Sequence, residues 1–238
     1  MPTRTIIILT LNEVEGVRWL LSDGPNLFEV ADEVVAVDGG STDGTRELIE
    51  SANIRVIDQE KSGRGEAFRV GVKSTRGDHL VFFSPDGNED PGDIPRIFDL
   101  LRRGKDIAIA SRFLRGSRNE EDGRIFPLRK WANQLFTIAA NQIWNRKDHV
   151  SDAINGFRGI SRIAFYRICP SSMGYTIEYE MTIRAMQQCM EIGEISTVEG
   201  ERRGGQTKAP SLSTGLLFMG LLFKEVFSSS TIGLRGSV

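Results

Sequence analysis

The chain has 238 residues, of which 39% are hydrophobic and 26% are charged, so it can bury a sizeable core and wholesale disorder is not expected. A formal net charge of −2 argues against a general nucleic-acid binder, and two cysteines with two histidines argue against a disulfide framework or a His/Cys metal cluster. Residues 1–101 carry 10 basic and 19 acidic side chains, whereas residues 102–238 carry 20 basic and 13 acidic ones. This asymmetry predicts unlike partners for the two halves.

The apolar runs are too short for a signal peptide or a membrane-spanning helix. Residues 6–9 end at once in polar side chains, and the stretch 209–223 is interrupted by proline, serines and glycines. We therefore expect a cytoplasmic protein, either free or peripheral on the cytoplasmic face of a membrane.

The first 111 residues alternate between strand-like and helix-like patterns. This alternation predicts an α/β fold with a mostly parallel sheet, covered by helices on both faces, whose ligands lie at the carboxyl ends of the strands. We expect strands at 5–10, 33–37, 54–57, 79–83 and 107–110, and helices at 14–21, 42–51, 65–74 and 94–103.

The second half has a different texture, with a basic loop at 112–129 followed by a clear amphipathic helix at 130–145. One side of that helix carries Trp131, Leu135, Ile138, Ala139 and Ile143, and we expect Trp131 and Trp144 to pack. The stretch 212–227 predicts an apolar helix, either in the core, at an oligomer interface or at a membrane surface. Further expected elements are a strand or turn at 155–160, helices at 161–168 and 178–190, a strand at 192–198, a loop at 204–206 and a frayed tail at 228–238.

The segment Val37–Thr45 ends a predicted strand and opens a predicted helix. Its glycines let the main chain approach a ligand closely, and the helix N-terminus presents free N–H groups. Asp38, at the strand end, is well placed to accept hydrogen bonds from a nucleobase or a ribose. Taken alone, the segment is equally typical of a turn in which Ser41 or Thr42 caps the helix.

A second segment, Phe82–Pro91, leads from an apolar strand straight into a cluster of oxygen-bearing side chains. Asp86 and Asn88 are two residues apart and would face the same side of an extended chain. Hard divalent cations take such oxygen ligands, and Mg²⁺ is typically held by one or two protein carboxylates plus substrate phosphates. Spacing alone does not decide between a metal site and an acidic turn that caps the next helix.

The order of the segments resembles that of a family-two glycosyltransferase of the GT-A fold. The segments that carry this likeness are 9–13, 38–45, 63–67 and 84–86. Five later segments resemble the dolichyl-phosphate mannosyltransferase branch of the family, and the likeness extends over roughly residues 4–225. These later segments are 111–113, 129–133, 152–158, 175–180 and 202–208.

The resemblance implies a Rossmann-type sheet with acceptor-side helices and loops in the second half, a nucleoside-diphosphate sugar as donor, and Mg²⁺ or Mn²⁺ as cofactor. It implies one catalytic domain at 1–227, with a nucleotide-sugar and metal half at 1–111, an acceptor half at 112–210, an apolar interfacial helix at 211–227 and a flexible tail at 228–238. The implied nucleotide-binding residues are Leu11, Glu13, Asp38, Arg64, Pro85 and Asp86, and the implied metal ligands are Asp86 and Asn88.

The resemblance also implies inverting transfer to a polyprenyl or dolichyl phosphate. The oxygen of such an acceptor is already anionic, so it needs cations to hold it rather than a strong base. A membrane surface, a second copy of the chain or a membrane-anchored subunit are compatible partners; nucleic acid is not. We expect acceptor contacts from Arg112, Arg129, Lys130, Asp152, Arg202, Arg203 and Lys208, and catalytic roles for Asp86, Arg129, Arg203 and Glu180.

Two alternatives stay open. A sugar hydroxyl as acceptor would need a carboxylate base, for which Asp152, Glu178 and Glu180 are candidates. For Asp152, a structural ion pair with Arg158 accounts for the pattern equally well. In addition, the family's usual Asp-x-Asp is Ser84-Pro85-Asp86 here, so the first carboxylate is missing and a non-catalytic homologue that binds nucleotide sugars is the second alternative.

Overall fold

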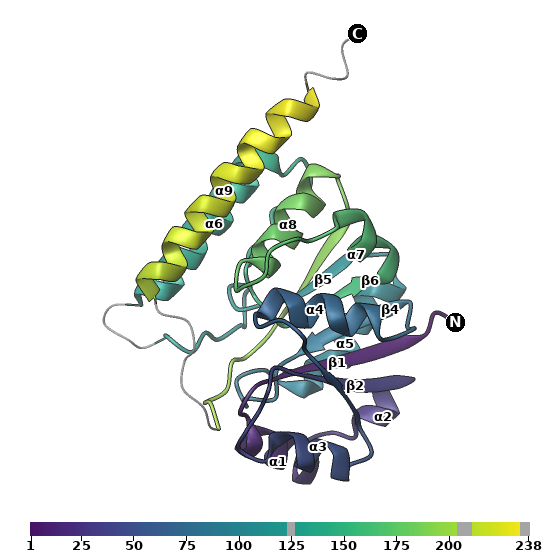
Figure 1. The fold of residues 1–238 in the computed structure, drawn as a ribbon. Helices are drawn as coiled ribbons and strands as arrows, with labels where there is room; N and C mark the ends of the chain where they lie inside the picture. The colour runs from purple at the N-terminus through teal and green to yellow at the C-terminus, as the bar shows by residue number, and fades with distance from the viewer. Residues whose placement is uncertain (123–126, 204–210, 234–238) are drawn as a thin grey trace.

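The structure is a computed structural model that describes residues 1–122, 127–203 and 211–233, and within the last range the side chains of residues 214–228 (Figure 1). Its strands form one sheet in the order β3-β2-β1-β4-β6-β5-β7. Neighbouring strands are parallel except around β6, which is antiparallel to both β4 and β5. The predicted α/β fold with a mostly parallel sheet is therefore confirmed.

Most predicted elements are present, with ends shifted by a few residues. The strands are β1 (Arg4–Thr10), β2 (Glu33–Asp38), β3 (Arg55–Asp58), β4 (His79–Phe83), β5 (Ile107–Ser111), β6 (Arg158–Ser161) and β7 (Ile192–Ser196). The helices are α1 (Val14–Ser22), α2 (Leu27–Val30), α3 (Thr45–Ser51), α4 (Arg64–Lys73), α5 (Ile94–Arg102), α6 (Leu128–Trp144), α7 (Arg162–Ile168), α8 (Ile177–Gln187) and α9 (Ser211–Gly233), with a short 3₁₀ turn, η1 (Pro91–Asp93).

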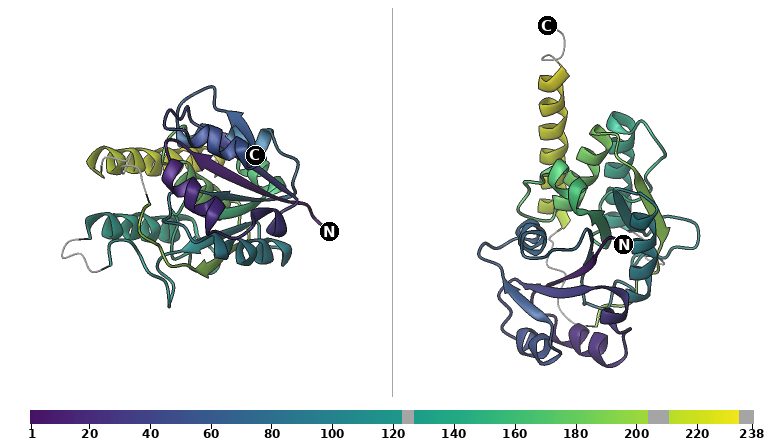
Figure 2. Two further views of the ribbon diagram at one scale, coloured as in Figure 1. Left: turned by 90° about the horizontal axis from the view of Figure 1, so that it is seen from below. Right: turned by 90° about the vertical axis from the view of Figure 1, so that its right-hand side faces the viewer.

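Helices cover both faces of the sheet (Figures 1 and 2). Side chains alternate along β1, so Ile7 and Leu9 pack beneath α4, α7 and α8, whereas Ile6 and Ile8 pack against α1, α2, α3 and α5. The strands β1, β4 and β5 are buried on both faces, as their continuous apolar sequences require. Both layers leave the carboxyl ends of the central strands free to build a site.

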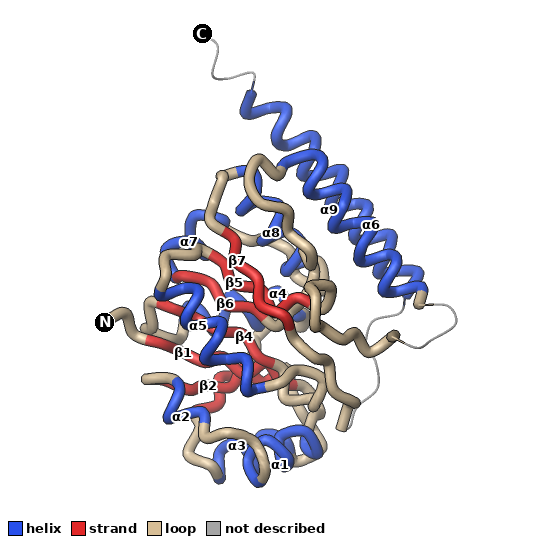
Figure 3. The backbone as a smooth tube through the Cα atoms, turned by 180° about the vertical axis from the view of Figure 1, so that it is seen from behind, coloured by secondary structure: helices blue, strands red, loops and turns tan. Residues whose placement is uncertain are grey.

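The helices α6 and α9 lie side by side along one flank of the molecule, outside the layer that covers the sheet (Figures 1 and 3). No helix within the described ranges is both long and apolar enough to cross a bilayer. We expected a tail from Ser228, but α9 continues to Gly233, so the expectation is wrong for residues 228–233. Residues 234–238 lie outside the described part of the chain.

The apolar side of α6 that we expected to pack faces outward instead. Trp131 is 52% exposed and Leu135 is 66% exposed. The inner side of α6 contains Asn141, whose amide exchanges two hydrogen bonds with the main chain of Val150, at 3.0 and 2.8 Å. The side of α6 that faces the core is thus the side whose amide, that of Asn141, anchors the loop at Val150. The buried residues of α6 are Thr137, Ala140, Asn141 and Trp144.

The helix expected at 42–51 begins only at Thr45, and Gly44, in a left-handed conformation with φ of 91°, is its N-cap. Ser41 does not cap the helix, because its main-chain N–H and its hydroxyl both donate to Asp38. The N–H of Thr42 donates to the side chain of Asn12 at 2.8 Å. These contacts hold the segment after β2 as a loop facing the ends of the strands.

Candidate active site

A cavity of about 470 Å³ opens at the carboxyl ends of β1, β2 and β4. This is the edge of a parallel sheet at which ligands are expected. One wall comes from the strand ends and the start of α4, and the other comes from α6, the loop 154–156 and the first residues of α8 and α9. Both halves of the chain therefore contribute to one site.

The loops after β1 and β2 bring two of the residues predicted to bind a nucleotide to the cavity wall. Leu11 and Glu13 line the cavity, and so does Gly39, which follows Asp38. Asp38 itself is 3% exposed and is not among the lining residues. Its carboxylate accepts the N–H and hydroxyl of Ser41 at 3.0 and 2.5 Å, so in this structure it shapes the loop.

The turn after β4 brings Asp86 and Asn88 to the cavity wall, with Pro85 buried behind them. One carboxylate oxygen of Asp86 accepts the N–H of Asn88 at 3.0 Å, and the other lies 3.5 Å from the guanidinium of Arg202. The amide nitrogen of Asn88 donates to the carbonyl of Gly200 at 3.1 Å, which leaves its amide oxygen as the atom that could bind a cation.

Glu89 also lines the cavity, and sequence reasoning did not single it out. Its Oε2 atom accepts the main-chain N–H of Ser84 at 2.7 Å. Burial and the nearby carboxylate of Asp86 raise the pKa of Glu89 to about 8, against the opposing charge of Arg64. The only sequence signal was its membership of the polar run after β4; nothing in the spacing predicts that the side chain returns to the strand end.

Arg64, the first residue of α4, lies on the same wall as the strand ends. Its guanidinium forms an ion pair with Glu178 and lies 5.6 Å above the ring centre of Phe68. Burial lowers the pKa of Arg64, but the carboxylates of Glu178, Glu89 and Asp86 outweigh it, so the pKa is raised overall. A Cβ atom on Gly156 would lie 2.1 Å from the Arg64 guanidinium, so this packing requires a glycine there.

Among the predicted acceptor-binding cations, Arg112, Arg129 and Arg202 line the cavity. Arg112 is largely neutralised, because it contacts both oxygens of Asp152 at 2.7 and 3.0 Å and Glu199 at 3.5 Å. Burial opposes the charge of Arg112, but these carboxylates raise its pKa overall. The nearest described carboxylate to Arg129 is that of Glu120, at 3.9 Å, so the positive charge of Arg129 is less fully compensated by neighbouring carboxylates.

Two other predicted cations, Lys130 and Arg203, do not line the cavity. The ammonium of Lys130 forms an ion pair with Asp122. The guanidinium of Arg203 lies 4.4 Å above the ring of Trp19, although its main-chain N–H donates to the carbonyl of Asp86 at 2.8 Å. Lys208 lies outside the described residues.

Within the described part of the chain, Asp152 and Arg158 do not form the ion pair that we considered from the sequence, so that prediction is wrong. Asp152 pairs with Arg112 and is fully buried, so it is a structural carboxylate. Arg158 is also fully buried, and it donates to the main-chain oxygens of Asn155, Ala153 and Glu178. The two residues brace the same loop through different partners.

Glu180, for which we expected a catalytic role, does not line the cavity, whereas Glu178 in the same helix does. Its carboxylate accepts the main-chain N–H groups of Ser171 and Ser172, at 2.9 and 2.7 Å, and lies 2.7 Å from Arg184. Burial alone would raise the pKa of Glu180, but these hydrogen bonds and the charge of Arg184 hold the pKa below its ordinary value of 4.5. Glu180 therefore anchors the segment before α8.

Glu180→Gln should destabilise the fold at pH 7 by about 2 kcal/mol, because charged hydrogen bonds are lost. A carboxylate with a lowered folded-state pKa stabilises the fold above its unfolded pKa and loses that contribution as the pH falls through the folded value. The difference between wild type and variant should therefore shrink below pH 4.5. Urea unfolding at pH 7 and pH 4 measures it, with the exposed Glu47→Gln as control; an equal difference at both values contradicts the assignment.

The donor atoms around Asp86 suit a hard divalent cation. Two carboxylates, those of Asp86 and Glu89, and the amide oxygen of Asn88 belong to one short turn on the cavity wall. Within the described part of the chain, no group of three or more His, Cys, Asp or Glu residues is arranged to hold a metal ion alone. Such a set fits Mg²⁺ or Mn²⁺ bound together with a phosphorylated ligand rather than a closed protein cage.

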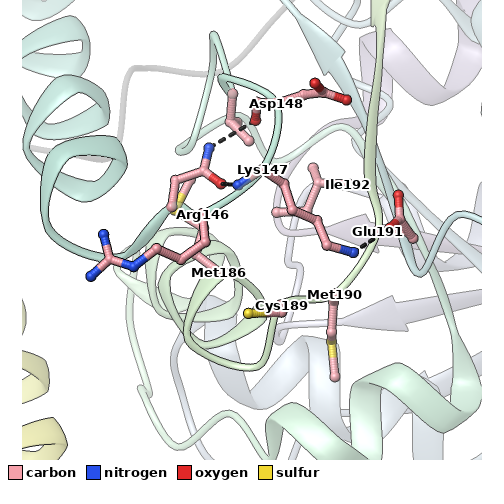
Figure 4. A pocket seen from close by; sticks show the side chains of 10 residues that line it. Arg146, Lys147, Asp148, Met186, Cys189, Met190, Glu191 and Ile192 are labelled. Atoms are coloured by element: carbon pink, nitrogen blue, oxygen red, sulfur yellow. Dashed lines mark hydrogen bonds and ion pairs between the residues drawn. The ribbon is translucent and has the colours of Figure 1, made fainter.

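A second pocket, between the end of α6 and the start of β7, is too small for a substrate (Figure 4). Its volume of about 10 Å³ holds at most one water molecule. The ammonium of Lys147 closes one side through an ion pair with Glu191. The large cavity is therefore the better candidate site.

Comparison with known proteins gives a family and several relatives. The family model described as glycosyl transferase family 2 matches residues 5–169. The chain is 28% identical over 232 residues to the glycosyltransferase AglJ of Haloferax volcanii, covering 95% of this chain and 73% of that protein. It is 29% identical to the dolichol-phosphate mannosyltransferase of Pyrococcus furiosus, covering 86% of this chain but 58% of that protein.

A third relative, the low-salt glycan biosynthesis hexosyltransferase Agl6 of Haloferax volcanii, is 30% identical over 85% of this chain and 49% of its own length. Among solved structures, glucosyl-3-phosphoglycerate synthase from Mycobacterium tuberculosis, in complex with Mn²⁺, UDP and phosphoglyceric acid, superposes with a TM-score of 0.68. The match covers 96% of this chain and 78% of that one at 23% identity, a level that supports the fold. The chain thus spans between about half and three quarters of the length of these three curated relatives.

Proposed function

This chain belongs to glycosyl transferase family 2 and has the GT-A fold, and we propose that it transfers a sugar with inversion from a nucleoside-diphosphate sugar to a polyprenyl phosphate. The observation that carries the proposal is the large cavity, which is lined both by an acidic turn at the strand ends and by arginines from the second half. The acidic turn suits a cation and a diphosphate, and the arginines suit a second, anionic substrate.

The donor side follows from the charge that develops in the reaction. Cleavage of the sugar–phosphate bond leaves negative charge on the diphosphate while the anomeric carbon becomes cationic. Arg64, held in place by Glu178, is a preorganised cation on the cavity wall and would stabilise that charge. A divalent cation bound near Asp86 would supply Lewis-acid stabilisation of the same leaving group.

The acceptor side is the finer part of the proposal. A phosphate oxygen attacks as an anion, so the chain needs to orient it from the face opposite the diphosphate rather than deprotonate it. Arg129 is the cavity cation best suited to this role. Arg112 is engaged by Asp152 and Glu199, and Arg202 lies 3.5 Å from the carboxylate of Asp86. Arginine's fork of N–H donors matches phosphate geometry.

The outer surface of α6 and α9 favours a lipid as the carrier of that phosphate. We define this α6–α9 apolar face by the exposed residues Trp131, Leu135, Ile138 and Ile143 of α6 and Leu216, Leu217, Met219, Phe223 and Phe227 of α9. Both helices also line the cavity, α6 through Phe136 and α9 through Phe218. The two helices that carry the apolar face thus also contribute to the cavity wall, an arrangement that would suit a membrane-bound acceptor with a long isoprenoid chain.

One observation favours the alternative in which the acceptor is a sugar hydroxyl. Glu199 lines the cavity, and burial raises its pKa despite the charge of Arg112. A carboxylate with a raised pKa is a candidate general base. Glu178, which was expected as a base, is less suited because its carboxylate is committed to Arg64.

Transfer of labelled sugar to polyprenyl phosphate in lipid vesicles, with the donor that a nucleotide-sugar screen selects, tests the proposal. Leu135→Asp, on the α6–α9 apolar face, should lower transfer to the vesicle-bound acceptor but not to a short-chain, water-soluble one. Equal loss with both acceptors, or a chain that forms a stable dimer through this face without lipid, would argue for a second copy of the chain on that surface.

A further inference from the structure

The turn after β4 begins with a serine, Ser84, and the side chain of a glutamate five residues later returns to it. Ser84 contributes only a hydroxyl at the strand end, which lies 3.4 Å from Arg64. The Oε2 atom of Glu89 accepts the main-chain N–H of the same Ser84 at 2.7 Å. The carboxylate of Glu89 is therefore hydrogen-bonded to the residue that follows β4, although that residue, Ser84, has no carboxylate of its own.

The second oxygen of Glu89 is available. Within the described part of the chain, Oε1 accepts no hydrogen bond and forms no ion pair, whereas the nearby Arg64 is paired with Glu178. Glu89 and Asp86 both line the cavity. The turn can close in this way because Gly87 has a φ of 84°, a conformation that glycine adopts readily.

An independent observation at the neighbouring strand points to a missing polar ligand. Thr10 ends β1, which pairs with β4 in a register that places their ends beside each other. Thr10 lines the cavity, and its hydroxyl oxygen is buried and has no hydrogen-bond partner among the described residues. Buried polar groups are rarely left unsatisfied, so an orphaned hydroxyl in a cavity-lining residue points to a polar ligand or an ordered water beside it.

We propose that Glu89 is the second carboxylate of a divalent-cation site and that its Oε1 atom binds Mg²⁺ or Mn²⁺ together with the carboxylate of Asp86. The inference rests on the proposed function, because the diphosphate of the donor supplies the remaining oxygen ligands. With Glu89 as a ligand, two protein carboxylates would lie near the cation even though residue 84 is a serine. Two carboxylates plus phosphate oxygens are a usual ligand set for Mg²⁺ in proteins.

Direct measurement of Mn²⁺ binding tests the inference without relying on activity. Free Mn²⁺ is followed by electron paramagnetic resonance, with Mn²⁺ alone and with Mn²⁺ plus UDP or GDP as diphosphate probes. Glu89→Gln should weaken Mn²⁺ binding in the presence of the nucleotide by about tenfold or more, since even the loss of an outer-shell partner costs that much. The double variant Ser84→Asp/Glu89→Gln, which restores a carboxylate at the strand end, should recover most of the affinity.

The exposed Glu47→Gln is the matched control and should bind Mn²⁺ as the wild type does; thermal unfolding of each variant checks that it is folded. Tight binding by the wild type with unchanged binding by Glu89→Gln overturns the role of Glu89 and leaves the proposed function intact. A wild type that binds no Mn²⁺ under any of these conditions overturns the metal dependence of the proposed function and this inference together. Failure of Ser84→Asp to rescue a folded double variant also counts against it.

Discussion

Asp86→Asn should lower kcat/KM for sugar transfer by about a thousandfold, the scale of losing a main electrostatic contact to a developing charge. The asparagine can still accept the N–H of Asn88, so the turn should keep its shape. What it removes is the negative charge that would hold a cation against the diphosphate. Steady-state kinetics at saturating Mg²⁺ or Mn²⁺ measure the effect.

The matched control is Asp90→Asn, in the same polar run. Asp90 accepts the N–H of Gly92 at 2.8 Å and is exposed, so its charge faces solvent rather than the cavity. We expect this variant to retain activity within a few-fold of the wild type. If Asp86→Asn were as active as Asp90→Asn, with the same response to added metal, Asp86 would not act in catalysis.

Arg158→Met should lower the free energy of unfolding by about 4 kcal/mol, as expected when one partner of a buried polar network is removed. Arg158 is fully buried, and burial lowers its pKa to about 10, so it is still charged at pH 7. Its guanidinium satisfies the main-chain oxygens of Asn155 and Glu178 and the hydroxyl of Thr182. Methionine fills similar space but removes these donors, and it leaves the main-chain oxygen of Asn155 without the hydrogen bonds that Arg158 supplies.

Urea unfolding at pH 7 measures this loss, with Arg76→Met as a control at an exposed arginine, expected within about 0.5 kcal/mol of the wild type. Because Arg158 braces both the loop 154–156 and the start of α8, surviving folded protein should also bind nucleotide less tightly. A variant that is as stable as the control would mean that water or a shifted side chain can replace these contacts.

Strands such as β1 and β4 could be predicted because each is a continuous apolar run that is too short for an ordinary helix. The motif at Val37–Thr45 also ends a strand as expected. The side of α6 that packs could not be predicted, since apolar residues such as Leu135 mark a face but do not say what covers it. Asn141 decided the outcome through contacts with a distant loop that periodicity does not reveal.

The site was predicted in part. Residues that lie at strand ends or helix starts, such as Asp86 and Arg64, line the cavity because topology alone brings those positions together. Ion pairs between residues far apart in the sequence could not be predicted. Arg112 pairs with Asp152, forty positions later, and Arg64 pairs with Glu178 of the other half. Such contacts depend on how loops fold over the sheet.

In the folded structure, part of the charge asymmetry between the two halves of the chain can be assigned to the cavity. The acidic turn around Asp86 comes from the first half, and the cavity arginines Arg112, Arg129 and Arg202 come from the second. The division is not strict, since Arg64 and Glu178 cross it and form an ion pair. Much of the remaining charge forms exposed pairs such as Arg4–Asp32, which contribute little to stability.

The most direct measurement of the central claim is transfer of a radiolabelled sugar from its nucleoside-diphosphate donor to polyprenyl phosphate, compared with the same polyprenol lacking the phosphate and with a soluble sugar acceptor. Our account predicts a lipid-linked monosaccharide of inverted anomeric configuration with the phosphorylated lipid and no product with the free polyprenol. Faster transfer to the sugar hydroxyl, or donor binding without transfer to any acceptor, would contradict it.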